Sequence, residues 1–256
     1  MDKRNAVLAA IGIVFICATV FAQPRKASIT IGGSYWNANL VLPEDIYQGI
    51  TADPGNMVGP YLNMRFGNWL LGGSMFFGTF TLHSGDAGTG FDLDIKRNDQ
   101  NFSFGYSLFK NFNVFAALKS VSYSADENMT TSYYDPYWGY RQGEGRVEMD
   151  NTGKLVGGGV SSVVPFSKSP FFLYGSAAYL TGKMDYSYSV SLGGTLTDLV
   201  AKKVNANLLS WSVGIGIQTS SGFSILVGYR MDSDSVEDGG EEQISGLTAT
   251  VAYTLR

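Results

Sequence analysis

Hydrophobic and polar residues alternate along most of the chain, most cleanly at its C-terminal end. Within 244–256, every second residue from Leu247 to Leu255 is apolar, and those between are mostly small or polar. Because successive side chains of a β-strand point to opposite faces, this pattern predicts a strand with one apolar and one polar face. Such a strand needs a partner along its outer edge. We expect it to pair with the first strand, which would close the sheet into a barrel.

The same alternation predicts an all-β chain of about ten strands. Their expected ranges are 26–39, 57–66, 69–82, 91–109, 112–124, 151–166, 171–190, 204–219, 223–231 and 244–256. Short turns such as Gly67-Asn68 alternate with longer polar links, of which 125–150 is the longest. This asymmetry is typical of a transmembrane, up-and-down, antiparallel β-barrel with an even number of strands. Weak alternation in the third and fifth ranges leaves eight or twelve strands as alternatives.

Periodicity does not by itself say which face lines the barrel interior. A soluble barrel turns its apolar face inward, whereas a membrane barrel turns it toward lipid. The small residues of the polar face suit a crowded lumen, and several strands exceed the usual length of about five or six residues. Aromatic residues also lie toward strand ends, as in the interfacial girdles of membrane barrels. They are Phe102, Phe104, Phe112, Phe172, Tyr174, Phe223 and Tyr253.

The N-terminus has the layout of a secretory signal peptide. Basic residues precede an uncharged apolar run over 6–20, and small residues follow it before Gln23. This run is short for a membrane-spanning helix, so cleavage is favoured over a retained anchor. We therefore expect a signal peptide over 1–22 and an outer-membrane barrel domain over 23–256. The single cysteine, Cys17, lies in the leader, so no disulfide framework is expected.

Composition supports an exported β protein. Glycine (32 residues), tyrosine (15) and phenylalanine (16) are abundant, which suits strands and membrane interfaces, while histidine and cysteine occur once each. The net charge of −4 gives no sign of the clustered basic surface that nucleic-acid binding requires. No cofactor is expected.

With its leader, its alternating strands and its closing strand, the chain resembles small bacterial outer-membrane β-barrel proteins of the OmpA-type and porin-like group. The resemblance covers 23–256 and is one of pattern, without a motif that singles out one member. It implies a monomer in the bacterial outer membrane, in contact with outer-membrane lipids and lipopolysaccharide and inserted by the outer-membrane assembly machinery. The group usually ends in an aromatic residue, whereas this chain ends in Leu255-Arg256.

Five charged residues fall on predicted inward faces and would form a lumen charge network. They are Arg65, Lys183, Asp185, Arg230 and Asp232. Charges inside a narrow barrel are costly unless they are paired or hydrated. They would either form a salt-bridged plug or line a pore and set its ion preference. A barrel of about ten strands has a slim lumen, which favours the plug.

Two other groups of residues are candidates for chemistry. The acidic link 233–242 could bind Ca²⁺ or lipopolysaccharide-bound cations, but its spacing lacks the calcium-loop pattern, so a solvated loop without a metal site is favoured. His83, near Asp86, could serve acid–base catalysis. The sequence lacks both the Asp-x-His pair of omptin-like proteases and the His-x-Ser of lipid A deacylases. An ordinary loop histidine is favoured, and no catalytic residue is assigned.

An aromatic cluster in the longest link is a candidate extracellular contact surface. It comprises Tyr133, Tyr134, Tyr137, Trp138 and Tyr140. Exposed Tyr and Trp give contact area at low entropy cost, but loop packing or an interfacial belt explains them equally well. We predict a barrel without enzymatic activity whose outer loops carry a structural or surface-interaction role, including contact with an extracellular ligand. The alternatives are a narrow channel for ions or small solutes and an outer-membrane enzyme acting on lipid A or peptides.

Overall fold

A computed structural model describes residues 27–43, 49–84, 92–135, 137, 139–192, 195–237 and 240–255. Within these ranges the chain forms eleven strands and no helix. The strands are β1 (Ser28–Val41), β2 (Ile50–Ala52), β3 (Gly55–Phe66), β4 (Trp69–Ser84), β5 (Asp92–Phe109), β6 (Phe112–Asp135), β7 (Gly139–Pro165), β8 (Phe171–Leu192), β9 (Thr195–Gln218), β10 (Phe223–Val236) and β11 (Gly240–Leu255). None of the residues described here belongs to a helix long and apolar enough to cross a membrane.

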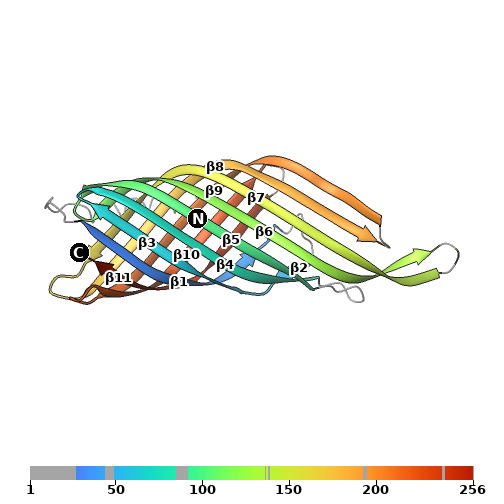
Figure 1. Cartoon of the computed structure of the whole chain (residues 1–256), viewed down its shortest axis with the longest axis horizontal. Coiled ribbons are helices and arrows are strands. Elements are labelled where there is room, and N and C mark those ends of the chain that lie inside the picture. Colours follow the sequence, from blue (N-terminus) through green and yellow to red (C-terminus); the bar gives the residue numbers. More distant parts are fainter. Residues whose placement is uncertain are drawn as a thin grey trace.

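The strands form a closed antiparallel barrel (Figure 1). β2 pairs only with the C-terminal end of β4, so it is not part of the ring. The ring consists of the other ten strands in sequence order. β11 pairs with β1 from Ile29↔Leu255 to Val41↔Gln243, and this pairing closes the ring. The predicted ten-strand up-and-down barrel and its closure by the last strand are therefore confirmed.

Several strands run much farther than their alternation predicts. The predicted link 125–150 is mostly a hairpin, since β6 extends to Asp135 and β7 begins at Gly139. Figure 1 shows the hairpins β6–β7 and β8–β9 extending beyond the other strands at one end of the barrel, with the C-terminus at the opposite end. The interpretation of 233–242 as a solvated loop is wrong for Asp234 and Glu242, which lie in β10 and β11 and point inward.

The outer surface of the barrel carries an apolar belt on the half nearest the short turns. On β11, Leu247 is 62% exposed and Val251 is 49% exposed, whereas Thr250 between them lines an interior cavity. Aliphatic and aromatic side chains on the other strands face outward in the same way. We define the belt by Ile29, Ile31, Phe66, Trp69, Phe102, Phe104, Leu118, Val156, Leu173, Tyr179, Val213, Ile215, Ile225, Val227, Leu247 and Val251, all exposed. An exposed apolar band with aromatic residues at its rim is the surface of a barrel that spans a lipid bilayer.

The predicted facing of β8 is wrong. Leu180 and Met184, expected on the lipid side, are buried inside the barrel, and Tyr174 lines the interior cavity. Leu173 and Tyr179 face outward instead. Apolar residues occupy both faces of this strand, so alternation alone cannot select the outward one. Phe112, expected in the outer aromatic girdle, is likewise buried at 2% exposure.

The interior changes character along the barrel axis. A cavity of about 320 Å³ is lined by small polar residues, among them Ser34, Asn63 and Ser212. Farther from the short turns, the interior is a packed apolar core that includes Phe80, Ile95 and other buried side chains. The prediction that small, polar side chains fill the whole lumen is therefore correct for only one part of the barrel. Beyond the belt the outer surface faces water, so apolar side chains there gain from pointing inward.

An arginine placed in the apolar belt is expected to destabilise the barrel. In Val227→Arg, the cation would face lipid, at a cost of about 2–4 kcal/mol near the bilayer midplane. Ser235→Arg is the matched control, because Ser235 lies on the same strand and face but beyond the belt. Denaturant unfolding in lipid vesicles measures both variants. Equal stability of the two would contradict a lipid-facing belt.

Candidate functional site

A buried charge network lies inside the barrel, where the apolar belt ends on β5 and β10. Its members come from β5, β6, β10 and β11, which are brought together only by closure of the ring. They are Arg97, Asp99, Lys119, Arg230, Asp232, Asp234 and Glu242. Polar and charged residues grouped in this way must satisfy one another, since water has little access to them.

Asp232 is the central acceptor of the network and is 1% exposed. Lys119 Nζ donates to its Oδ2 at 2.5 Å, and Arg230 Nη2 donates to the same oxygen at 2.7 Å. The Ser210 hydroxyl donates to Oδ1 at 2.6 Å. The carboxylate is therefore satisfied on both oxygens, which is what allows a charge to be buried at this depth.

Arg97 and Asp99 form a second, fully buried pair next to the first. Arg97 donates to both Asp99 oxygens, from Nε at 2.7 Å and from Nη2 at 3.1 Å. Asp99 also lies 3.3 Å from Lys119 Nζ, which links the two pairs. The remaining Arg97 nitrogen donates to the Tyr123 hydroxyl and, at 3.2 Å, to Glu242. Such bidentate geometry is the strongest form of side-chain ion pairing.

Two aromatic rings of the apolar core contact the network. The Arg230 guanidinium lies over the ring of Trp36, 4.5 Å from its centroid, and over Phe76 at 5.3 Å. The two rings pack edge to face at 5.9 Å. Trp36 is completely buried. These cation–π contacts connect Arg230 on β10 with rings on β1 and β4.

Asp234 differs from the other carboxylates of the network in how one of its two oxygens is satisfied. Its Oδ1 is buried and has no hydrogen-bond partner among the residues that the structure describes. Asp234 lies closer to the hairpin end of β10 than Tyr229, which is the last exposed aromatic residue on the outer face of that strand. Burial raises the pKa of Asp234 to about 7; Lys119 opposes this shift, and Glu242 adds to it. The network has three cations and four carboxyl groups, so a protonated Asp234 leaves it neutral.

The sequence-predicted lumen residues divide among three places. Arg230 and Asp232 lie in the buried charge network. Arg65 lies apart from it, donating to Ser107 at 3.2 Å. Lys183 and Asp185 are on the outer surface, where Asp185 pairs with Lys203, and this corrects their predicted inward facing. Their displacement follows from the reversed facing of β8.

Five members of the network were missed: Arg97, Asp99, Lys119, Asp234 and Glu242. For β5 the signal was available, because the outward residues Phe102 and Phe104 fix the parity and place Arg97 and Asp99 inward. Lys119 gave no comparable signal, since it stands alone among apolar and small neighbours.

The aromatic cluster lies largely outside the described side chains. Tyr137, at the tip of the β6–β7 hairpin, is 91% exposed. Tyr133 and Tyr134 lie in β6 and Tyr140 in β7, but only their backbone is described. Trp138 falls outside the described residues. The contact surface therefore stays a prediction, as does the signal peptide over 1–22, which also lies outside the described ranges.

His83 joins three segments at the far end of β4. Its Nε2 lies 3.0 Å from Asp53 and its Nδ1 lies 2.7 Å from Asp92. Hydrogen bonds raise the pKa of His83, and the bond to Asp92 contributes more than the bond to Asp53. Asp86, the partner considered from the sequence, is outside the described residues. In the described part of the chain, no group of three or more His, Cys, Asp or Glu side chains is arranged to hold a metal ion.

No protein-family model matches the chain, and no curated protein matches it. Solved structures similar to it include small outer-membrane barrels, as the sequence resemblance predicted. The outer membrane protease OmpT from Escherichia coli is 12% identical, with 93% of this chain and 100% of that chain covered and a TM-score of 0.48. The translocator domain of autotransporter NalP from Neisseria meningitidis is 10% identical, with coverages of 98% and 95% and a TM-score of 0.47. Neisserial surface protein A is 13% identical, with coverages of 90% and 99% and a TM-score of 0.36. These likenesses concern the barrel architecture and assign no activity to this chain.

Proposed function

We propose that this chain is a monomeric outer-membrane barrel with a closed lumen, which acts through the hairpins projecting beyond its apolar belt. The observation that carries the proposal is an outward apolar belt together with a network of ion pairs buried in the lumen. A membrane location follows from the belt, because so much exposed apolar surface is unfavourable in water. Short turns at one end and long hairpins at the other support an orientation with the hairpins outside the cell.

A blocked lumen argues against the channel alternative. Phe76, Lys119 and Arg230 line the polar cavity, and their partners Trp36, Asp99 and Asp232 are almost completely buried, which supports a lumen that is blocked at this level. Moving an ion through them would require separating buried pairs whose partners would then be left unpaired, which is strongly unfavourable. The network is thus better suited to hold the barrel closed than to select ions.

We infer further that the chain is not an enzyme. Its single imidazole, His83, has a carboxylate on each ring nitrogen, Asp53 on one and Asp92 on the other. A general base needs a nitrogen within reach of the proton that it removes from the substrate. Both nitrogens of His83 are already engaged, and the arrangement is better explained as a tie between β4, β5 and the segment after β2.

The hairpins supply the surface for an interaction role. The β6–β7 hairpin carries exposed ion pairs, in which Arg146 donates to Asp126 at 2.7 and 2.8 Å and lies 3.1 Å from Glu148. Its tip carries the exposed Tyr137. A projecting hairpin with an aromatic tip offers contact area at low entropy cost to an extracellular ligand.

The closed lumen is tested by electrical recording. Refolded protein inserted into a planar lipid bilayer is expected to give no stable conductance steps, with a sixteen-stranded porin as the positive control. Heat-modifiable migration on gels of the same preparation verifies that the barrel is folded. Reproducible unitary conductance from folded protein would contradict the proposal and favour the channel.

A further inference from the structure

An apolar groove of about 740 Å³ crosses the outer surface of the barrel from β1 to β7. Its floor is the backbone of one row of hydrogen-bonded, inward-pointing residues, and the outward side chains on either side of this row form its walls. The floor residues are Gly32, Tyr61, Ser74, Asn101, Lys119 and Leu155, in register across six strands. One wall is apolar and includes the exposed belt residues Ile31, Phe102 and Leu118.

The opposite wall becomes polar and then cationic along its length. It passes from Met75 through Gln100 and Ser120 to Lys154, which are in register across β4 to β7. Ile31 lies near the short-turn end of β1, whereas Lys154 lies on β7 well away from Pro165 and its short turn. The groove therefore climbs the apolar belt, with its apolar end toward the short turns and its cationic end toward the long hairpins.

A second lysine stands beside the cationic end. Lys183 on β8 is directly opposite Lys154 on β7. Both are exposed, and neither forms an ion pair or hydrogen bond within the described part of the chain. Like charges directly opposite across two strands destabilise a sheet unless an anion lies between or near them. On their strands, both lysines are the first charged residues beyond the belt residues Val156 and Tyr179.

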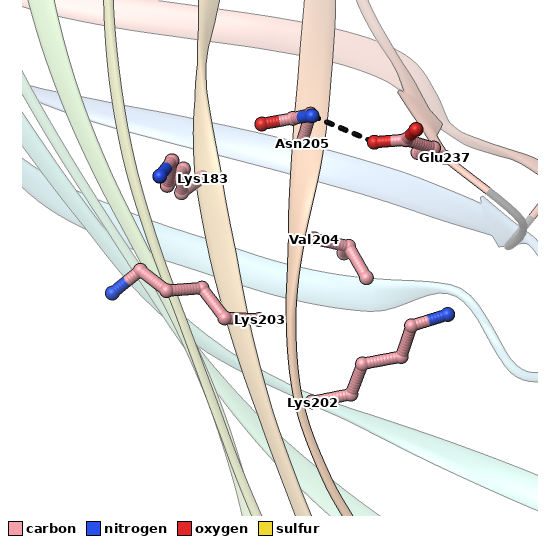
Figure 2. A pocket seen from close by; sticks show the side chains of 6 residues that line it. All are labelled: Lys183, Lys202, Lys203, Val204, Asn205 and Glu237. Carbon is pink, nitrogen blue, oxygen red and sulfur yellow. Dashed lines mark hydrogen bonds between the residues drawn. The ribbon is translucent and has the colours of Figure 1, made fainter.

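Two other basic residues on this outer surface, unlike Lys154 and Lys183, are paired with carboxylates. Lys203 on β9 pairs with Asp185 at 3.0 Å, and Arg146 pairs with Asp126. Figure 2 shows Lys183 and Lys203 on adjacent strands, with Asn205 beside them hydrogen-bonded to Glu237. Asp185, Asp126 and Glu237 are thus engaged with other residues, and the positive charge at Lys154 and Lys183 remains available to an external anion.

We propose that this groove binds lipid A, the phosphorylated and acylated glycolipid of the outer leaflet. An acyl chain lies along the apolar wall, and a phosphate accepts hydrogen bonds from Lys154 and Lys183. Phosphate is the anion that paired lysines at a membrane surface attract, and Gln100 and Ser120 supply further polar contacts for a sugar headgroup. The choice of lipid A over a phospholipid rests on the proposed orientation, which places the cationic end in the outer leaflet.

The test measures lipid retained by the folded barrel. Detergent-purified protein is incubated with purified lipid A, and the bound fraction is read by native mass spectrometry. The double variant Lys154→Gln, Lys183→Gln is expected to retain about tenfold less lipid A than the wild type. Leu118→Trp, which enlarges a side chain on the apolar wall, is expected to lower retention as well. Lys203→Gln is the matched control and is expected to bind normally.

Two outcomes would overturn the inference. Equal retention of dephosphorylated lipid A would show that the lysines do not hold a phosphate, and equal retention of phosphatidylglycerol would show that the groove takes phospholipid. Either result leaves the closed lumen untouched, because conductance is measured separately. Conversely, a conducting barrel that still loses lipid A in the double variant would contradict the proposed function while supporting the groove.

Discussion

Replacing Asp232 by alanine is expected to lower the free energy of unfolding by about 3–5 kcal/mol, the usual cost of removing one partner of a buried ion pair. Lys119 and Arg230 both donate to this carboxylate. Without it, two cations would remain buried with too few acceptors, and the Ser210 hydroxyl would also lose its partner. Urea unfolding of the refolded protein, followed by tryptophan fluorescence, measures the change.

Asp185→Ala provides the control for this variant. Asp185 also pairs with a lysine, but both side chains are more than half exposed, at 53% and 58%. Exposed pairs contribute at most about 1 kcal/mol, because water solvates the freed charge. Equal destabilisation by the two alanine variants would show that the network does not carry the stability assigned to it here.

Asp234→Asn is expected to stabilise the barrel above neutral pH and to have no effect near pH 4. The pKa of Asp234 rises from 3.8 to about 7 in the folded protein. Between these values the unfolded chain is ionised at this residue while the folded chain keeps its proton. The folded state then binds more protons, so stability falls as pH rises through this window and stays lower above it. Above this window the free energy of unfolding of the wild type is lowered by up to about 4 kcal/mol.

The measurement is the unfolding free energy of wild type and variant at several pH values from 4 to 8. Asparagine preserves the size of the side chain but cannot ionise, so the wild-type curve should descend more steeply with pH. Burial also raises the pKa of Glu242, so some pH dependence remains in the variant. Parallel curves for the two proteins would contradict a protonated Asp234, and Asp185→Asn is expected to follow the wild-type profile.

The fold was predictable because lipid imposes an alternation on the spanning part of most strands. Leu247, Val251 and their neighbours identify both the strand and its outward face from sequence alone. The alternation does not extend to the hairpins. Beyond the belt, water on the outside and a packed core inside reverse the pattern, and the polar residues near 125–135 look like a loop although they continue β6.

The site was only partly predictable. Arg230 and Asp232 stand on a strand whose outward face is unambiguous, so their inward facing could be deduced. Lys119 could not be recognised in this way, because its partner Asp232 is 113 residues away and meets it only across the closed ring. The inward facing predicted for Lys183 and Asp185 is wrong for a local reason, because β8 is apolar on both faces near Leu173 and Leu180.

The apolar residues change from the outer to the inner face along single strands, and this has a consequence for insertion depth. On β5, Phe102 and Phe104 point outward, whereas Leu93 and Ile95, nearer the hairpin end, point inward. A shift of the barrel deeper into the bilayer would carry hydrophilic outer side chains such as Gln100 into hydrocarbon, and a shift out of it would wet the phenylalanines. Because both shifts are unfavourable, the outer face of the strands itself fixes the depth of the barrel in the bilayer, without any anchor outside the barrel wall.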